Sequence, residues 1–453
     1  MCNSSAMLRV KGGIPMEALV LTLFCAALLC CVVLEKSILL ALLFGLGLFL
    51  TYGRLRGHRW KALAGMCLEG VKTVKNVVIT FCLIGALTAL WRACGTIAVI
   101  VCWASKLIWP PLFLLLAFLL NCGMSILTGT AFGTAATMGV ICAAIGSALN
   151  IPTVLLGGAV LSGVYFGDRC SPISTSALLV AELTGTDIYS NIRDMLRSAR
   201  VPLLLSCGAY MLLGLWAFTG GTVPDLQAIF SRELNLHWAA VLPAAAILLL
   251  SALRWNVKRS MLVSILLSLP IAVGIQGAAV SSLPELILTG YHAADPQLAA
   301  LMDGGGLFSM LRLVGIVTIS SAYAGIFHAT GLLEPLKRAI ARLSRRTTPY
   351  FAALITAFLT GMVACNQTLT IMLTHELCGS LIAGKNCRAL TPEDTAVVAA
   401  PLIPWSIAGG VPLSSVGAPG SSLFFACFLY LLPLWNIVTA AVRRRKEGTY
   451  EAH

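Results

Sequence analysis

The sequence has few charged residues and no polar stretch long enough to form a separate soluble domain. Only 11% of its 453 residues are charged, whereas 58% are hydrophobic, and the mean hydropathy is +0.91. A soluble globular domain is usually about a quarter charged. Most of the chain therefore cannot face water, and the fold class that we expect is an all-α polytopic membrane protein.

Motifs for nucleotide, metal and nucleophile chemistry are also missing. The sequence contains no Gly-Lys-Ser/Thr phosphate-binding loop, no nucleophile elbow and no His/Cys set with metal-ligand spacing. The 16 cysteines are scattered and include no Cys-x-x-Cys pair, so we interpret them as small apolar packing residues. ATP-driven transport and hydrolysis have no support, and we expect neither an enzyme nor a bound cofactor.

What the chain does contain is a series of apolar runs along its whole length. Several approach the roughly 20 residues that cross about 30 Å of hydrocarbon as a helix, and others are interrupted by Gly, Pro, Ser or Thr. We expect about ten to twelve membrane segments, some of them re-entrant or broken. The first run, Met16–Leu34, lacks a clear cleavage site and is followed at once by another, so we interpret it as a retained helix.

The net charge of +13 comes from basic residues in short loops and near the C-terminus. The clusters are Arg54, Arg56, Arg59 and Lys61; Arg254, Lys258 and Arg259; Lys337, Arg338, Arg342, Arg345 and Arg346; and Arg443 to Lys446. The positive-inside rule places such loops in the cytoplasm. We therefore expect a multi-pass protein of the cytoplasmic (inner) membrane of a prokaryote, with membrane lipids and no nucleic acid as partners.

Two halves of the sequence can be aligned with each other. In the first half, Pro111 opens an apolar run that reaches Gly123, and in the second half Pro349 opens a run that reaches Gly361 with the same spacing. Each run leads into a polar interruption, and further along each half has a break that contains Ser and Pro. Internal repetition of this kind predicts a transporter built from two structural repeats.

Loop charge favours opposite orientations for the two repeats. The loop before the first repeat is basic, whereas Tyr291–Gly306 has Asp295 and Asp303 and no Lys or Arg. Equivalent loops of an inverted pair lie on opposite sides of the membrane. We therefore divide the chain into residues 1–60, N-terminal transmembrane helices; 61–220, first inverted repeat; 221–290, linking transmembrane helices; 291–442, second inverted repeat; and 443–453, basic cytoplasmic tail.

Unwound chain inside the membrane marks the candidate site, because its carbonyls and hydroxyls can replace an ion's hydration shell. Pro172 removes a backbone donor and disfavours helix at Ser171, which predicts a break there. If the helix continued, its periodicity would put Ser171 and Thr175 on the same side as Asp168. Intramembrane acids are usually functional, so we expect Asp168 to coordinate a cation or carry a proton; a structural ion pair with Arg169 is the alternative.

The polar interruptions of the two repeats supply further candidates. Asn366 and Gln367 carry amide oxygens that suit a hard cation or a polar solute, with pairing of neighbouring helices as the alternative. The related interruption in the first repeat contains Thr128 and Thr130, whose hydroxyls could also bond back to their own helix. The candidate ion or substrate ligands are Asp168, Ser171, Ser174, Thr175, Thr128, Thr130, Asn366, Gln367 and Ser406, with Asp168 and Asn366 as the candidate Na⁺ ligands.

With these residues the sequence resembles the NhaC-type sodium/proton antiporter family over about residues 60–440. The run Gly167-Asp168-Arg169-Cys170-Ser171-Pro172 is the most specific match. The other matching stretches are Gly85–Gly95, Thr128–Thr134, Gly167–Asp187, Asn366-Gln367 and Pro401–Trp405. The resemblance implies Na⁺/H⁺ antiport by a homodimer, in which a transport domain of hairpins and broken helices moves against a scaffold like an elevator.

One departure from the family pattern keeps a second hypothesis open. Where related sequences read Ser-Asp-Thr-Thr-Asn, this chain reads Ser174-Thr175-Ser176-Ala177-Leu178. Fewer carboxylates and amides lower the field strength of a cation site. The alternative is Na⁺- or H⁺-coupled exchange or symport of a small organic solute, such as a carboxylate or an amino acid. A channel or receptor without coupled transport offers no reason for paired polar breaks at membrane depth.

Overall fold

A computed structural model describes residues 16–34, 36–107, 109–217, 226–253, 255–330, 334–382 and 384–450. Across these residues the chain is helical, with one isolated bridge between Tyr291 and Gly304 and no β-strand. The all-α prediction is therefore confirmed. The chain forms two compact units, the first from Met1–Asn76, Arg312–Ile407 and Ala440–His453, the second from Val77–Leu311 and Ala408–Thr439.

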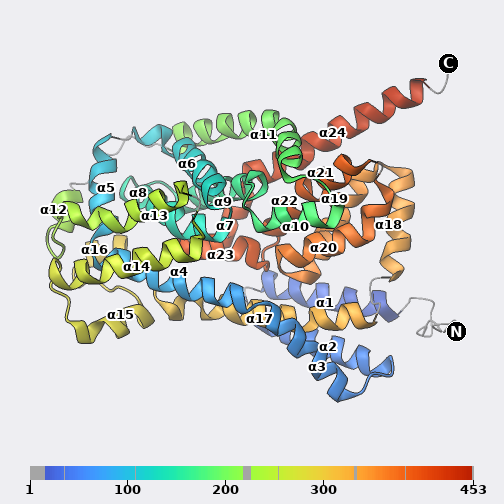
Figure 1. Cartoon of the computed structure of the whole chain (residues 1–453), viewed down its shortest axis with the longest axis horizontal. Helices are drawn as coiled ribbons and strands as arrows, with labels where there is room; N and C mark the ends of the chain where they lie inside the picture. The colour runs from blue at the N-terminus through green and yellow to red at the C-terminus, as the bar shows by residue number, and fades with distance from the viewer. Residues whose placement is uncertain are drawn as a thin grey trace. The chain divides into compact units, whose positions relative to one another are not determined.

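Figure 1 labels the helices of both units. The first unit contains α1 (Met16–Val33), α2 (Ile38–Leu55), α3 (Trp60–Thr73), most of α17 (Leu307–Thr330), α18 (Glu334–Arg346), α19 (Pro349–Ala364), α20 (Gln367–Cys378), α21 (Lys385–Asp394) and α22 (Ala396–Ala399). The second contains most of α4 (Lys75–Ala93), then α5 (Thr96–Leu107), α6 (Phe113–Thr128), α7 (Ala131–Thr134), α8 (Val140–Ala148), α9 (Thr153–Cys170), α10 (Thr175–Thr184), α11 (Ile188–Ala217), α12 (Leu226–Phe230), α13 (Leu242–Ala252), α14 (Val257–Gly274), α15 (Leu283–Thr289), α16 (Pro296–Met302), most of α23 (Ile407–Ser415) and the first part of α24 (Cys427–Tyr450).

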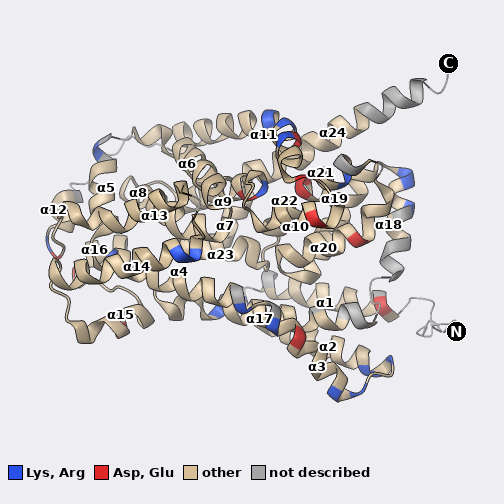
Figure 2. Ribbon diagram, in the orientation of Figure 1, with Lys and Arg blue, Asp and Glu red and all other residues tan. Residues whose placement is uncertain are grey.

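The helices have the length and composition of membrane spans. Within the described ranges, five are long and apolar enough to cross a membrane, or up to seven if each of two bent pairs counts as one span. Shorter apolar helices, α19 among them, accompany these. Charged residues concentrate in the loop after α2, in α18 and at the start of α11, whereas α6, α8 and α13 contain none (Figure 2). The chain is a multi-pass membrane protein.

In the second unit, α6 and α9 lie side by side (Figure 1). Small residues permit this close approach: a Cβ added to Gly163 would lie 2.6 Å from the carbonyl oxygen of Phe118, and one on Gly167 would lie 2.3 Å from the Cβ of Ser125. Interiors are close-packed, so a larger side chain at either glycine would force the helices apart. The packing thus holds the C-terminal end of α9, which carries Asp168, against the C-terminal end of α6.

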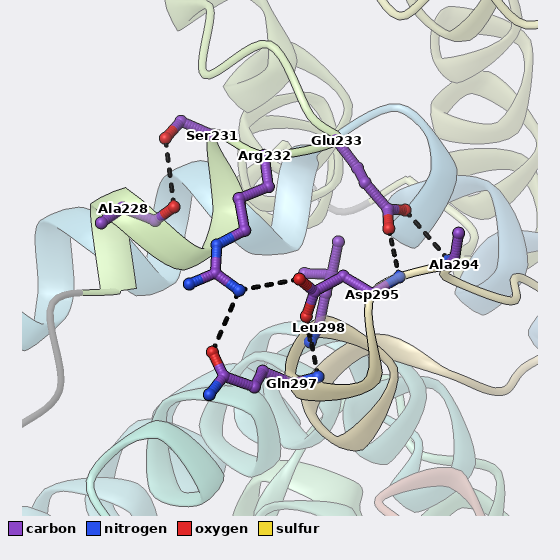
Figure 3. Close-up of polar contacts among 8 residues, drawn as sticks. All are labelled: Ala228, Ser231, Arg232, Glu233, Ala294, Asp295, Gln297 and Leu298. Atoms are coloured by element: carbon purple, nitrogen blue, oxygen red, sulfur yellow. Dashed lines mark hydrogen bonds and ion pairs between the residues drawn. The ribbon is translucent and has the colours of Figure 1, made fainter.

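Away from these helices, four polar side chains join the loop after α12 to the start of α16 (Figure 3). Arg232 donates from Nη1 to Asp295 Oδ2 at 2.7 Å and to Gln297 Oε1 at 3.1 Å. Glu233 accepts hydrogen bonds from the backbone N–H groups of Asp295 and the residue before it. Asp295 also caps the first turn of α16. We call Arg232, Glu233, Asp295 and Gln297 the loop clasp.

Candidate functional site

The helix break predicted at Pro172 is present in the second unit. Residues 171–174 are not helical and separate α9 from α10. This turn lies against another interruption, the left-handed Gly129 (φ 63°) between α6 and α7. A Cβ added to Gly129 would lie 2.6 Å from the side chain of Ile173. The two polar breaks predicted for the first repeat are therefore neighbours in the structure.

Asp168 lies in the last turn of α9 and is only 3% exposed. Its two carboxylate oxygens accept hydrogen bonds from different serines: Ser174 donates to Oδ1 at 3.1 Å, and Ser176 donates to Oδ2 at 2.8 Å. We call Ser174 and Ser176 the serine pair. A buried carboxylate beside unwound chain can bind a cation or a proton, which is the chemistry expected of Asp168.

The other predicted ligands near Asp168 are arranged differently from a continuous helix. Ser171 is buried but donates its hydroxyl to the carbonyl oxygen of Ile126, at 2.7 Å, at the end of α6. Thr175 is exposed at the start of α10. Because the chain turns at Pro172, the helical spacing that would align Ser171 and Thr175 with Asp168 is interrupted.

Sequence reasoning missed Ser176, the residue that holds the second carboxylate oxygen. A signal for it exists, because Ser174 follows a proline turn and precedes a helix, as N-cap serines do. Ser174 is indeed the N-cap of α10 and accepts from the N–H groups of Ser176 and Ala177. A helix restarting at that point turns Ser176 back toward the end of α9.

Arg169, next to Asp168, is fully buried and binds α11. Its Nη2 donates to Ser198 Oγ at 2.7 Å and to the carbonyl oxygen of Met195 at 3.3 Å. A buried guanidinium needs several acceptors to offset its lost hydration. These bonds fasten the end of α9, and with it the Pro172 break, to the neighbouring helix.

The hydroxyls of the first interruption bond mainly within that interruption. Thr130 is the N-cap of α7, with the N–H of Gly133 at 3.5 Å from its Oγ1. The hydroxyls of Thr128 and Thr134 lie 2.7 Å apart, and Thr134 also donates to the carbonyl oxygen of Thr130. A π-helical turn, Ala135–Gly139, follows directly. Such turns are rare and often occur at functional sites.

In the first unit, Asn366 caps a helix. Its Oδ1 accepts from the N–H of Leu369 at 2.9 Å, and its Nδ2 donates to the carbonyl oxygen of Ala364 at 3.0 Å. Gln367, predicted beside it as a ligand, is the partly exposed first residue of α20. Ser406 is buried and donates to the carbonyl oxygen of Cys365 at 3.3 Å. The predicted ligands of the second repeat thus surround one helix break.

The interruptions in the two units have the same backbone form. Cys365, like Gly129, is left-handed, with φ 57° against 63°. The following residues, Asn366 and Thr130, are extended N-caps with φ −146° and −153°. A non-glycine residue rarely adopts a left-handed conformation, so Cys365 marks a position where the fold imposes the break.

The neighbouring proline-containing turns are also alike. The N–H of Ser174 bonds to the carbonyl oxygen of Ser171 at 3.2 Å, and the N–H of Ser406 bonds to that of Ile403 at 2.9 Å. Each turn supplies a donor to a carbonyl at the end of the adjacent helix. In the first unit this donor is Trp405 Nε1, 2.9 Å from the carbonyl oxygen of Met362.

The available ligands are oxygen atoms. Among the described residues, no group of three or more His, Cys, Asp or Glu side chains could hold a metal ion. Around Asp168 the structure offers one carboxylate with two serine hydroxyls bound to it. Hard cations prefer oxygen ligands, and a proton needs only one of the carboxylate oxygens.

Comparison with known proteins finds similarity to several antiporters. The chain is 27% identical over 400 residues to the Na⁺/H⁺ antiporter NhaC of Alkalihalophilus pseudofirmus, covering 85% of this chain and 86% of the relative. It is 26% identical over 420 residues to a malate-2H⁺/Na⁺-lactate antiporter of Bacillus subtilis, covering 89% and 87%. It is also 26% identical over 378 residues to the arginine/ornithine antiporter ArcD of Halobacterium salinarum, covering 80% and 78%.

A family model describes the same relationship over nearly the whole sequence. The model of the Na⁺/H⁺ antiporter family matches residues 7–181 and 163–442. Both matched segments contain Asp168. The chain belongs to the Na⁺/H⁺ antiporter family.

Proposed function

We propose that this protein exchanges Na⁺ for protons across the cytoplasmic membrane as a secondary antiporter, without a bound cofactor. The observation that carries the proposal is Asp168, a buried carboxylate at the end of a broken helix. Membership in the Na⁺/H⁺ antiporter family supports it. Asp168 is the central group that holds either Na⁺ or a proton.

The candidate ligands other than Asp168 differ in their location and exposure. The hydroxyls of Ser171, Ser174, Thr128 and Thr130 lie in the second unit with Asp168. Asn366, Gln367 and Ser406 lie in the first unit and stay candidate ligands on the sequence prediction. Thr175 is the weakest of the set, because its side chain is exposed.

We also propose that the two units carry inverted repeats and that transport proceeds by an elevator-like movement in a homodimer. The repeats are supported by the shared backbone form of the Gly129 and Cys365 interruptions. Their opposite orientation is supported by the loop charges, basic before one repeat and acidic before the other. The elevator and the dimer rest on the resemblance to NhaC-type antiporters.

The test is cation-driven proton movement in proteoliposomes that contain the purified protein. Adding Na⁺ on one side should dissipate an imposed proton gradient with wild type. Asp168→Asn should abolish this response, because an amide cannot exchange a proton for a cation. Its elution profile and melting temperature should stay close to wild type, since Asn keeps the size of the side chain.

Asp194→Asn is the matched control. Asp194 is a partly exposed acid in α11 that pairs with Arg197 at 3.3 Å, so its loss removes one acidic charge that belongs to a surface ion pair. It should leave the Na⁺ response intact. Full coupled transport in Asp168→Asn would show that Asp168 is a structural acid and would remove the central group of the proposal.

Organic solutes belong in the same assay. Two of the relatives are named as malate/lactate and arginine/ornithine antiporters. The Na⁺/H⁺ activity is the better supported, because it is the description of the matching family and of the NhaC relative. Counterflow of a dicarboxylate or a basic amino acid, with no response to Na⁺, Li⁺ or K⁺ alone, would replace it with the organic-solute alternative.

A further inference from the structure

The serine pair engages both oxygens of the Asp168 carboxylate at once. The contacts are 3.1 Å from Ser174 Oγ to Oδ1 and 2.8 Å from Ser176 Oγ to Oδ2. The two serine oxygens lie 2.8 Å from each other. All three residues are at most 5% exposed. The carboxylate is therefore held at two points, which fixes the plane of the group as well as its position.

The serine pair is itself fixed by the start of α10. Ser174 Oγ accepts from the backbone N–H of Ser176 at 3.2 Å and of Ala177 at 3.4 Å. Ser176 Oγ also lies 3.3 Å from the backbone oxygen of Asp168. These contacts join the last turn of α9 to the first turn of α10 across the Pro172 break, so the orientation of Asp168 depends on both helices.

Hydrogen bonds to both oxygens fix the directions in which the Asp168 carboxylate can bind a cation. An ionised carboxylate has about four acceptor positions, and each serine occupies one of them. The remaining positions then point in directions set by the protein. Ligands held in place before binding avoid the entropy cost of ordering them when the ion arrives.

We propose that Ser176 is a positioning residue for the transported cation and acts through Asp168. Its hydroxyl fixes the carboxylate plane and thereby sets the apparent affinity for the cation. This inference rests on the proposed antiport function. It assigns to Ser176 a role that helical spacing through Pro172 had given to Thr175, whose side chain is exposed.

The experiment measures initial antiport rates in proteoliposomes against Na⁺ concentration at a fixed pH. Ser176→Ala should raise the KM for Na⁺ about tenfold, the size expected when a hydrogen bond to a charged group is lost. The maximal rate should stay within about twofold of wild type, because the carboxylate itself remains. Ser176→Thr keeps the hydroxyl and should restore the wild-type KM.

Ser206→Ala is the matched control for removing a buried serine hydroxyl. Ser206 is also fully buried, in α11, but it donates to the carbonyl oxygen of Pro202 in its own helix. Its KM should equal that of wild type. A merely structural role of Ser176 would lower the amount of folded protein or the maximal rate and leave KM unchanged, so the two readouts separate the roles.

The same assay separates failure of the positioning role from failure of the proposed antiport. If wild type shows no cation response, antiport itself is wrong. If wild type responds and Ser176→Ala keeps a wild-type KM, the positioning role is wrong. Should Ser176→Ala fail to fold, Ser176→Cys keeps a side chain of the same shape, slightly larger and with a weaker donor. A raised KM for Ser176→Cys, restored by Ser176→Thr, then supports the proposal, and a wild-type KM overturns it.

Discussion

Asn366 carries a local structural role as well as its predicted role in ion binding. Both ends of its amide are used by nearby backbone, since Oδ1 accepts from Leu369 and Nδ2 donates to Ala364. Asn is among the best N-cap residues. The same side chain therefore stabilises the start of α20, directly after the left-handed Cys365.

We expect Asn366→Ala to destabilise the protein by about 1 kcal/mol, the usual cost of losing an N-cap. Asn366→Ser should recover most of that stability, because its hydroxyl can accept the same backbone hydrogen bond. Thermal unfolding in detergent measures both. Thr130→Ala is the comparison at the equivalent break, where the capping distance is 3.5 Å, and it should cost less. Equal stability of Asn366→Ala and wild type would refute the capping role.

Among the elements, the loop clasp shows how charged side chains outside the membrane spans connect distant segments. Arg232 binds Asp295 and Gln297 across more than sixty positions of sequence, and Figure 3 shows its guanidinium directed at both. The hydrogen bond from Arg232 is the main reason that the pKa of Asp295 lies below its ordinary value of 3.8. The backbone N–H groups at the start of α16 lower the pKa further.

This lowered pKa predicts a pH dependence for the stability of the loop clasp. Because the pKa of Asp295 is lower in the folded state, its contribution is present above the unfolded pKa of about 3.9 and is lost as pH falls through the folded pKa. Asp295→Asn should therefore lower the melting temperature slightly at pH 7, and the difference from wild type should shrink below about pH 4. Glu285→Gln, an exposed acid in α15, is the control for charge alone.

A difference in melting temperature between Asp295→Asn and wild type that persisted unchanged into acid would contradict this account. It would mean that the ionised carboxylate is not what stabilises the clasp. The effect is expected to be small in any case, because the pair is exposed to water and screened by salt.

For the whole molecule, the proposed inverted repeat predicts the side of the membrane on which two loops lie. The basic loop around Gly57 should face the cytoplasm, and the acidic loop Tyr291–Gly306 should face the opposite side. An epitope inserted after Gly57 should be accessible to antibody only in permeabilised cells, and one inserted after His292 should be accessible in intact cells. Accessibility of both epitopes from the same side would rule out the inverted arrangement.

The amino-acid sequence is sufficient to predict the class of this protein and the positions of its helix breaks. Low charge, apolar runs and basic loops are sufficient for a multi-pass helical protein, because lipid leaves few other ways to satisfy the backbone. Pro172 predicts one break, because proline lacks a backbone N–H and disfavours a helical conformation at the preceding residue. The Gly167–Pro172 run indicates the family, and the family model matches the same residues.

Which side chains gather around Asp168 depends instead on how the helices pack. Helical periodicity pointed to Thr175, but the chain turns at Pro172 and a new helix begins directly after Ser174, so Ser176 faces the carboxylate instead. Likewise, no local signal marks Cys365 as left-handed, since that conformation usually selects glycine. Both features depend on how one helix end packs against another, and such contacts between distant segments are not encoded in local sequence spacing.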